Sequence, residues 1–89
     1  MAINYDQVSV GTSATSIISS NTNEKVRTIK NIGSNSIFVG GDSSVTTSNG
    51  FPIDAGETLD VSDYTGEVFG IVATSTENAN YIEEDFQWA

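Results

Sequence analysis

Short apolar runs separated by turn residues are the main pattern of this chain. Runs rich in Val, Ile and Thr recur about every eight to twelve residues between clusters of Gly, Ser, Asn or Asp, a spacing typical of β-sandwiches and barrels. β-branched residues pack well on a pleated sheet, and no segment carries the apolar stripe of an amphipathic helix. We therefore expect an all-β fold, a single small antiparallel β-sandwich or partly open barrel of about seven strands, over residues 1–89.

The strands are expected between the turn clusters. These segments are Tyr5–Val10, Ala14–Ile18, Glu24–Ile32, Ser36–Val39, Thr58–Val61, Val68–Ala73 and Asn80–Glu84. Gly33, Ser34 and Asn35 tolerate positive φ, so the chain is expected to reverse there into a β-hairpin whose returning strand is Ser36–Val39. Pro52 cannot donate to a ladder, which places Phe51–Ile53 at a sheet edge or outside the sheet.

The segment Glu24–Ile32 departs from simple strand patterning. Its apolar residues Val26, Ile29 and Ile32 are three positions apart, which breaks the alternation expected of a strand with one buried face. A helix would also give this spacing, but the β-branched residues and the turn that follows favour a strand. The spacing then implies either a β-bulge or burial on both faces.

Length, charge and the lack of cysteine limit how the chain is stabilised and what it binds. A domain of 89 residues has a modest core, and with no Cys it has no disulfide, so we expect help from neighbouring subunits. The formal net charge of −9 makes nucleic acid and anionic membranes improbable partners and favours a cationic one. No basic segment precedes an apolar run near the start, so we expect a protein that is made in the cytoplasm and stays soluble.

Enzyme and metal chemistry find little support in the residues. With no His and no Cys, the commonest general base, the thiolate nucleophile and the nitrogen or sulfur ligands of zinc are missing. The Asp60 and Asp63 pair is better explained as solvated turn residues. The loop from Asp60 to Glu67 fails the EF-hand spacing, and Gly40–Ser44 lacks the Lys of a phosphate loop, which favours a turn that ends a strand. We expect no enzyme activity, no metal and no cofactor.

The middle half of the chain resembles a known group of proteins. The residues that carry the resemblance are Asn31–Gly40, Val45–Thr47, Asn49–Ile53, Ala55–Leu59 and Val68–Ala73. They resemble small β-sandwich virion proteins of tailed phages, which include capsid decoration (cement) proteins, head fibres and modules of tail fibres. The resemblance rests on turn glycines and core residues, which specify a fold rather than a partner.

The resemblance implies a structural role in a phage particle. We expect a decoration protein that binds the major capsid protein on the outside of the capsid and stabilises it, and a tail-fibre or head-fibre module that contacts the host is the alternative. Together with the small size of the chain, the threefold positions of capsid lattices favour a homotrimer. A carbohydrate-binding module is disfavoured, because Tyr5, Tyr64, Tyr81 and Trp88 are too scattered in the sequence to form an aromatic platform.

Two groups of residues are candidates for a protein interface. The only basic residues, Lys25, Arg27 and Lys30, lie within one expected strand, and acidic residues Glu83, Glu84 and Asp85 end the last one. The basic strand is either a charged edge strand paired with those acids in the same chain, or a surface that meets the acidic end of a neighbouring subunit or the capsid.

The aromatic residues near the end of the sequence form the second group. Phe86 and Trp88 lie within four residues of its last position, and large aromatic side chains are costly to expose. We expect them to pack either against the core of their own chain or into a neighbouring subunit as anchors.

Overall fold

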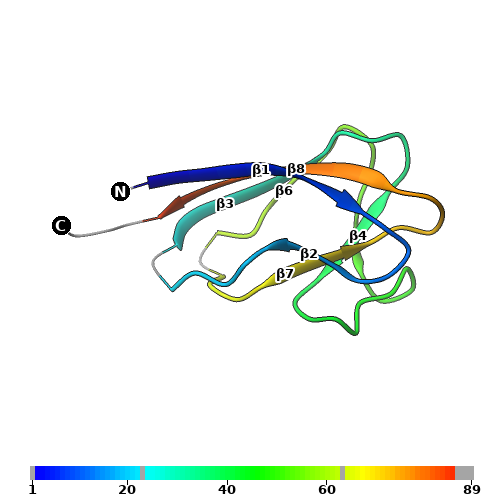
Figure 1. Cartoon of the computed structure of the whole chain (residues 1–89), viewed down its shortest axis with the longest axis horizontal. Coiled ribbons are helices and arrows are strands. Elements are labelled where there is room, and N and C mark those ends of the chain that lie inside the picture. Colours follow the sequence, from blue (N-terminus) through cyan, green and yellow to red (C-terminus); the bar gives the residue numbers. More distant parts are fainter. Residues whose placement is uncertain (1, 23, 63, 86–89) are drawn as a thin grey trace.

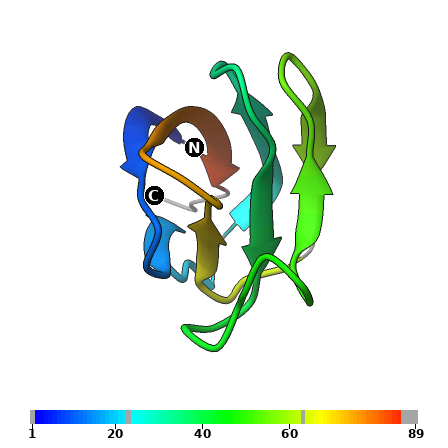
Figure 2. The same ribbon diagram turned by 90° about the vertical axis from the view of Figure 1, so that its right-hand side faces the viewer.

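Two four-stranded antiparallel sheets make up the protein. The computed structural model describes residues 2–22, 24–62 and 64–85, with the side chains of residues 2, 24, 25 and 85 left out of the description. The strands are β1 (Ala2–Val10), β2 (Thr15–Ile18), β3 (Glu24–Asn31), β4 (Ile37–Gly40), β5 (Phe51–Ile53), β6 (Thr58–Asp60), β7 (Val68–Ile71) and β8 (Glu77–Asp85). One sheet has the order β1-β8-β3-β6 and the other β2-β7-β4-β5, and the two form the layers of a β-sandwich (Figure 1, Figure 2).

The strand order follows from one long hairpin that is rolled up. The first half of the chain pairs with the second half in nested antiparallel fashion, β1 with β8, β2 with β7, β3 with β6 and β4 with β5. Two further pairings, β3 with β8 and β4 with β7, join these strand pairs into the two four-stranded sheets. This is the topology of an eight-stranded jelly roll.

The structure confirms the expected fold class and most of the expected strands. All seven segments contain a strand, and β7 lies between β2 and β4, as its apolar sequence indicates. The eighth strand is β5, which contains Pro52. It lies at the edge of its sheet, where the missing N–H of a proline is tolerated.

The expected hairpin at Gly33–Asn35 is wrong. β3 and β4 belong to different sheets, so residues 32–36 carry the chain from one layer to the other. Gly33 is also not in the positive-φ region, which among the described residues holds Gly56 (φ 81°) and Ser75 (φ 59°). Gly33 is needed for space, because a Cβ there would lie 2.0 Å from a carboxylate oxygen of Glu77.

The apolar spacing of Glu24–Ile32 has a different origin from the one expected. A register shift occurs between Glu24 and Val26, but from Val26 onward β3 alternates regularly. Arg27, Ile29 and Asn31 are its buried residues, at 0% exposure, while Val26 is 39% exposed. Polar side chains thus occupy two of the inward positions of β3. The alternation of buried and exposed residues is therefore not visible as an alternation of apolar and polar residues in the sequence.

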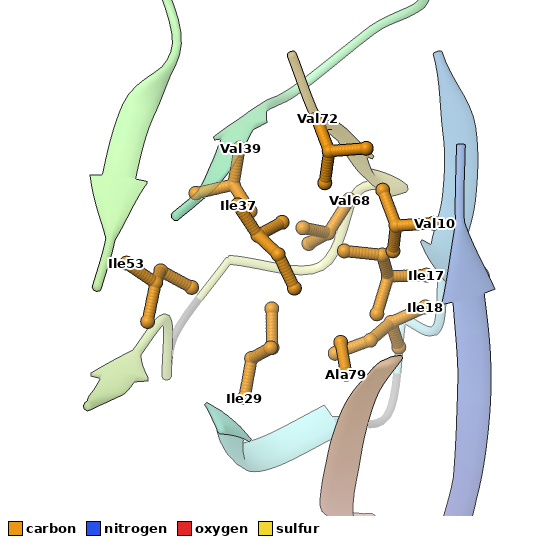
Figure 3. Packing of buried hydrophobic residues seen from close by; sticks show 10 residues of the cluster. All are labelled: Val10, Ile17, Ile18, Ile29, Ile37, Val39, Ile53, Val68, Val72 and Ala79. Atoms are coloured by element: carbon orange, nitrogen blue, oxygen red, sulfur yellow. The ribbon is translucent and has the colours of Figure 1, made fainter. Parts of the chain in front are cut away.

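The core between the sheets is aliphatic. Figure 3 shows Ile29 and Ala79 of one sheet directed toward residues of the other. The cluster consists of Val10, Ile17, Ile18, Ile29, Ile37, Val39, Ile53, Val68, Val72 and Ala79. The partly buried Val8, Leu59, Val61 and Tyr81 pack around it.

Asn31 joins β3 to three neighbouring segments. Its Nδ2 donates to the carbonyls of Asn35 and Ile53, both at 2.8 Å, and its Oδ1 accepts from the N–H of Gly33 at 2.8 Å. Its own backbone accepts from the N–H of Gly56. Buried backbone groups at this crossing therefore find partners in one side chain, as buried polar groups must.

Glu77 of β8 holds the same crossing from outside. Its carboxylate accepts hydrogen bonds from the N–H of Ser34 (2.9 Å) and from Nδ2 of Asn35 (2.8 Å). The bond from Ser34 and then that from Asn35 hold the pKa of the Glu77 carboxyl below its ordinary value.

Replacement of Asn31 should destabilise the protein. We expect Asn31→Ala to lower the free energy of unfolding by about 2–4 kcal/mol, because the carbonyls of Asn35 and Ile53 lose a buried donor. Asn80→Ala, an exposed asparagine in the same sheet, should change it by less than about 0.5 kcal/mol. Urea unfolding followed by circular dichroism measures both, and equal effects would contradict the role given to Asn31.

Acid should weaken the crossing through Glu77. A carboxyl whose pKa is lower in the folded state stabilises the fold above its unfolded pKa, and that stabilisation is lost as the pH falls through the folded pKa. Stability should therefore decline below about pH 4, and Glu77→Gln should show a shallower decline than the wild type. Chemical denaturation at a series of pH values tests this, and parallel pH profiles for the two proteins would refute it.

Candidate interaction surface

Four exposed apolar side chains lie on neighbouring strands on the outer face of the β1-β8-β3-β6 sheet. Tyr5 is 77% exposed, Ile3 58%, Ile82 48% and Val26 39%. In the ladder Ile3 lies opposite Glu84, which lies opposite Val26, and in the next row Tyr5 lies opposite Ile82. We call Ile3, Tyr5, Val26 and Ile82 the apolar strip.

The strip surrounds one carboxylate. Glu84 lies between Ile3 and Val26 across the strands, and the residue two positions before it in β8 is Ile82. These four residues line a shallow hollow of about 200 Å³. It lies close to the start of β1 and the end of β8, at the end of the sandwich where the described chain begins and ends (Figure 1).

β1 forms the edge of this sheet beside the strip. The N–H of Gln7 donates to Oδ1 of Asp6 at 2.8 Å, so it is turned away from β8 and is satisfied locally. A charged residue in mid-strand discourages addition of another strand to an edge. Burial, and next the charges of Asp6 and Glu83, raise the pKa of the Tyr81 hydroxyl above its ordinary value.

A buried ion pair lies beneath the strip. Arg27 Nε donates to Glu83 Oε2 at 2.5 Å, and the two side chains are 0% and 5% exposed. Glu83 Oε1 accepts from Asn21 Nδ2 at 3.1 Å and from Asn4 Nδ2 at 3.3 Å. The pair therefore connects β3 and β8 to β1 and to the loop after β2.

The guanidinium of Arg27 also satisfies the loops at this end of the sandwich. Nη1 donates to the carbonyls of Tyr64 (2.8 Å) and Gly66 (2.5 Å), and Nη2 donates to the carbonyl of Ser19 (2.8 Å). The Arg27 side chain thus brings together the β2–β3 and β6–β7 connections, whose carbonyls would otherwise need other donors.

These contacts separate the basic residues into different roles. The expectation of a charged edge strand is wrong, because β3 lies between β8 and β6. Pairing within the chain is confirmed for Arg27 and Glu83, and their burial removes both from any surface that a partner could contact. Lys30 is exposed on the outer face. The side chain of Lys25 lies outside the description.

Of the acidic and aromatic candidates, the structure describes one on the surface. Glu84 belongs to the hollow in the apolar strip. Asp85 pairs with Ala2 and Glu24 through its backbone, and its side chain is outside the description. Phe86 and Trp88 lie outside the described residues, so their packing stays a prediction.

The sequence contained a signal for the strip that hydrophobicity alone did not reveal. In β1, Ile3 and Tyr5 have odd numbers while the inward Val8 and Val10 have even numbers, so the two pairs must face opposite sides of a regular strand. Val26 belongs to the outer face for the same reason, which requires knowing that Arg27 points inward.

A second apolar groove opens between the two sheets. It has a volume of about 380 Å³ and is lined by Val39, Gly40, Gly41, Phe51, Leu59, Val61, Tyr64 and Val68. Phe51 is 61% exposed and Tyr64 40% exposed. The Tyr64 hydroxyl donates to the carbonyl of Glu67 at 3.2 Å, and none of the lining residues carries a charge.

The catalytic and metal candidates do not form a reactive constellation in the described structure. Asp60 Oδ1 accepts from the hydroxyl and the N–H of Ser62, which lower the pKa of Asp60, whereas a general acid needs a raised pKa. Its suggested partner Asp63 lies outside the described residues. Across residues 2–22, 24–62 and 64–85 no group of three or more acidic side chains is placed to hold a metal ion.

Two smaller observations complete the survey of sites. β4 ends at Gly40. In the turn that follows, the Asp42 carboxylate accepts hydrogen bonds from the N–H and the hydroxyl of Ser44, so it bonds within the turn. These bonds, that of the hydroxyl first, lower the pKa of Asp42, and a turn that ends the strand is confirmed. In the described part of the chain, no helix has the length and apolar character required to cross a membrane.

Comparison with known proteins supports the fold and gives no family. No model of a known protein family matches the chain, and no curated protein matches its sequence. The structure is similar to a chain from work on Bacillus endospore appendages, described as a novel family of disulfide-linked pili. The TM-score is 0.50 at 13% sequence identity, over 96% of this chain and 89% of that chain. At this identity the likeness concerns the β-sandwich fold alone.

Removal of one partner of the buried ion pair should be far more costly than removal of an exposed charge. We expect Arg27→Met to lower the free energy of unfolding by about 3–5 kcal/mol, because Glu83 is left buried without its counter-ion. Lys30→Met removes the same charge from the exposed face of the same strand and should cost less than about 0.5 kcal/mol.

A double variant separates the ion pair from simple loss of packing. Arg27→Met combined with Glu83→Leu should be destabilised by less than the sum of the two single changes, since no buried charge remains. Thermal and urea unfolding measure the three variants. Additive effects would show that the two side chains stabilise the fold independently.

Proposed function

We propose that this protein is a structural subunit of a tailed-phage particle, a decoration protein that binds the outer surface of the capsid and stabilises it. The observation that carries the proposal is the apolar strip of Ile3, Tyr5, Val26 and Ile82, exposed on a sheet whose interior is already satisfied. An exposed cluster of this kind marks an interaction surface more often than a solvated one. We further propose that the protein has no enzymatic activity and no cofactor.

The sequence resemblance and the topology support this assignment. The residues that resemble phage virion proteins include β4, β5, β7 and most of β6, together with the crossing from β3 to β4 and parts of the β4–β5 and β5–β6 connections. Eight-stranded jelly rolls are common in viral coat proteins and also in lectins, so the fold is compatible with a particle component without specifying one.

The chain offers no disulfide with which to join subunits. The pilus chain of similar fold is described as disulfide-linked, whereas this chain has no cysteine. We propose that its subunits are held by non-covalent contacts. Several weak contacts made at once give durable attachment through effective concentration, and a homotrimer at a threefold position of the capsid would supply them.

The proposal predicts binding to capsids that lack the protein. Purified protein mixed with expanded capsids of its own phage should bind at a copy number that matches the lattice and should raise the temperature at which the capsids disrupt. Binding should weaken with salt, because a chain of charge −9 docks onto cationic patches. Light scattering on the free protein should give the mass of three chains.

The outcomes separate the parts of the proposal. Capsid binding by a protein of monomeric mass would refute the trimer and leave the decoration role. A failure to bind any capsid of its own phage would refute the decoration role and favour the alternative, a tail-fibre or head-fibre module that contacts the host. A control with a capsid already carrying the protein excludes non-specific adsorption.

A further inference from the structure

We propose that the hollow around Glu84 is a docking site for one basic side chain, lysine or arginine, of a partner protein. The proposal states which kind of side chain the partner would present in the particle role described above. It rests on that role only for the identity of the partner. The site consists of the Glu84 carboxylate and three apolar residues, Ile3, Val26 and Ile82.

The shape and composition of the hollow match a lysine or arginine in two parts. These side chains bury an aliphatic stem along an apolar surface while the charged head meets a carboxylate. The volume of about 200 Å³ is of the order of one such side chain. Tyr5, opposite Ile82 in the neighbouring row, adds an aromatic ring within the strip, a favourable neighbour for a cation.

The electrostatics select a cation over an apolar anchor. The ion pair recorded in the described structure joins Arg27 to Glu83, and Glu84 has no described basic side chain within ion-pair distance. An apolar partner that covered the strip would remove the Glu84 carboxylate from water without compensation, which is costly. A basic side chain compensates the carboxylate and contacts Ile3, Val26 and Ile82 at the same time.

The net charge of the chain acts in the same direction. The chain as a whole carries −9, so a basic segment of a partner is attracted before contact. A second copy of this chain is a weaker occupant of the hollow, because it would bring further negative charge to the Glu84 carboxylate.

Lys25 precedes Val26, a residue of the hollow, in the sequence, and its side chain lies outside the description. Its replacement by Gln belongs in the test, because it separates an added lysine from a lysine of the chain itself. If the hollow accepts basic side chains, Lys25→Gln should leave the affinity for an added lysine unchanged or increase it.

The test uses a peptide that carries a single basic side chain. Labelled protein is titrated with acetyl-Gly-Ser-Lys-Ser-Gly-amide, and backbone amide shifts are followed by NMR. We expect saturable shifts centred on Ile3, Val26, Ile82 and Glu84, with a dissociation constant on the order of millimolar, as suits a single side-chain contact. An arginine peptide at the same site shows which basic head group fits better.

Two changes test the two halves of the site. Glu84→Gln should weaken lysine-peptide binding by about fivefold or more, because the cation loses its counter-charge. Replacement of lysine in the peptide by diaminopropionic acid keeps the charge but shortens the stem, and should weaken binding by about fivefold or more through lost apolar contact. Ile82→Ser should have an effect similar to that of the shorter stem.

The matched control is Asp54→Asn. It removes the same charge from an exposed turn after β5, where the carboxylate accepts from the Ser36 hydroxyl, and it should change peptide affinity by less than about twofold, as expected of a remote screened charge. If Glu84→Gln and Asp54→Asn weaken peptide binding equally, or if binding does not depend on stem length, the binding is general electrostatic attraction and the proposal is overturned. Shifts centred elsewhere would also overturn it.

The capsid experiment distinguishes this inference from the proposed function. Capsid binding by the wild type and equally by Glu84→Gln, with no peptide binding at the hollow, would refute the site and leave the decoration role. Peptide binding at the hollow without capsid binding would support the site and refute the decoration role. The amide spectrum of each variant confirms that it is folded.

Discussion

The guanidinium of Arg27 holds together one end of the sandwich. Its donors satisfy the carbonyls of Ser19, Tyr64 and Gly66, and its ion pair with Glu83 joins the two central strands of one sheet. Without it, the loops at this end would lose the donor to these three carbonyl groups, and Glu83 would be a buried charge without its counter-ion. Asn31 fulfils the same task for the crossing near the other end of β3. The short aliphatic core fills the space between these two polar contacts.

This arrangement determines where the protein is able to interact with others. The buried Arg27, Asn31 and Glu83 side chains are hydrogen-bonded within the described structure, so they are not available to a partner. The apolar strip and Glu84 lie on the outer face of the sheet directly above the Arg27–Glu83 pair, and alternation along β8 is what separates the two glutamates. Adjacent residues in one acidic run thus lie on opposite faces of the sheet: Glu83 belongs to the buried ion pair, and Glu84 lines the hollow on the outer face.

Nested pairing of the two halves of the chain also explains the positions of the termini. Because β1 pairs with β8 along nearly their whole length, the start and end of the described chain lie together at the Arg27 end of the sandwich (Figure 1). The apolar strip is built from the same two strands and β3. The strip therefore lies at the end of the sandwich where the described chain begins and ends.

The sequence by itself determined the fold class, the positions of most strands, the edge location of Pro52 and the turn after Gly40, because these depend on local chemistry: β-branching, a missing N–H and short polar side chains that bond to their own backbone. Tertiary structure decided the rest. Gly33–Asn35 has the residues of a hairpin turn, but Asn31 and Glu77 hold it as a crossing between sheets. Arg27 has the sequence properties of a surface charge, yet carbonyls from loops far apart in the chain make its burial favourable. Local sequence does not contain those partners, so neither the interior position of Arg27 nor the outward exposure of Val26 beside it was predictable.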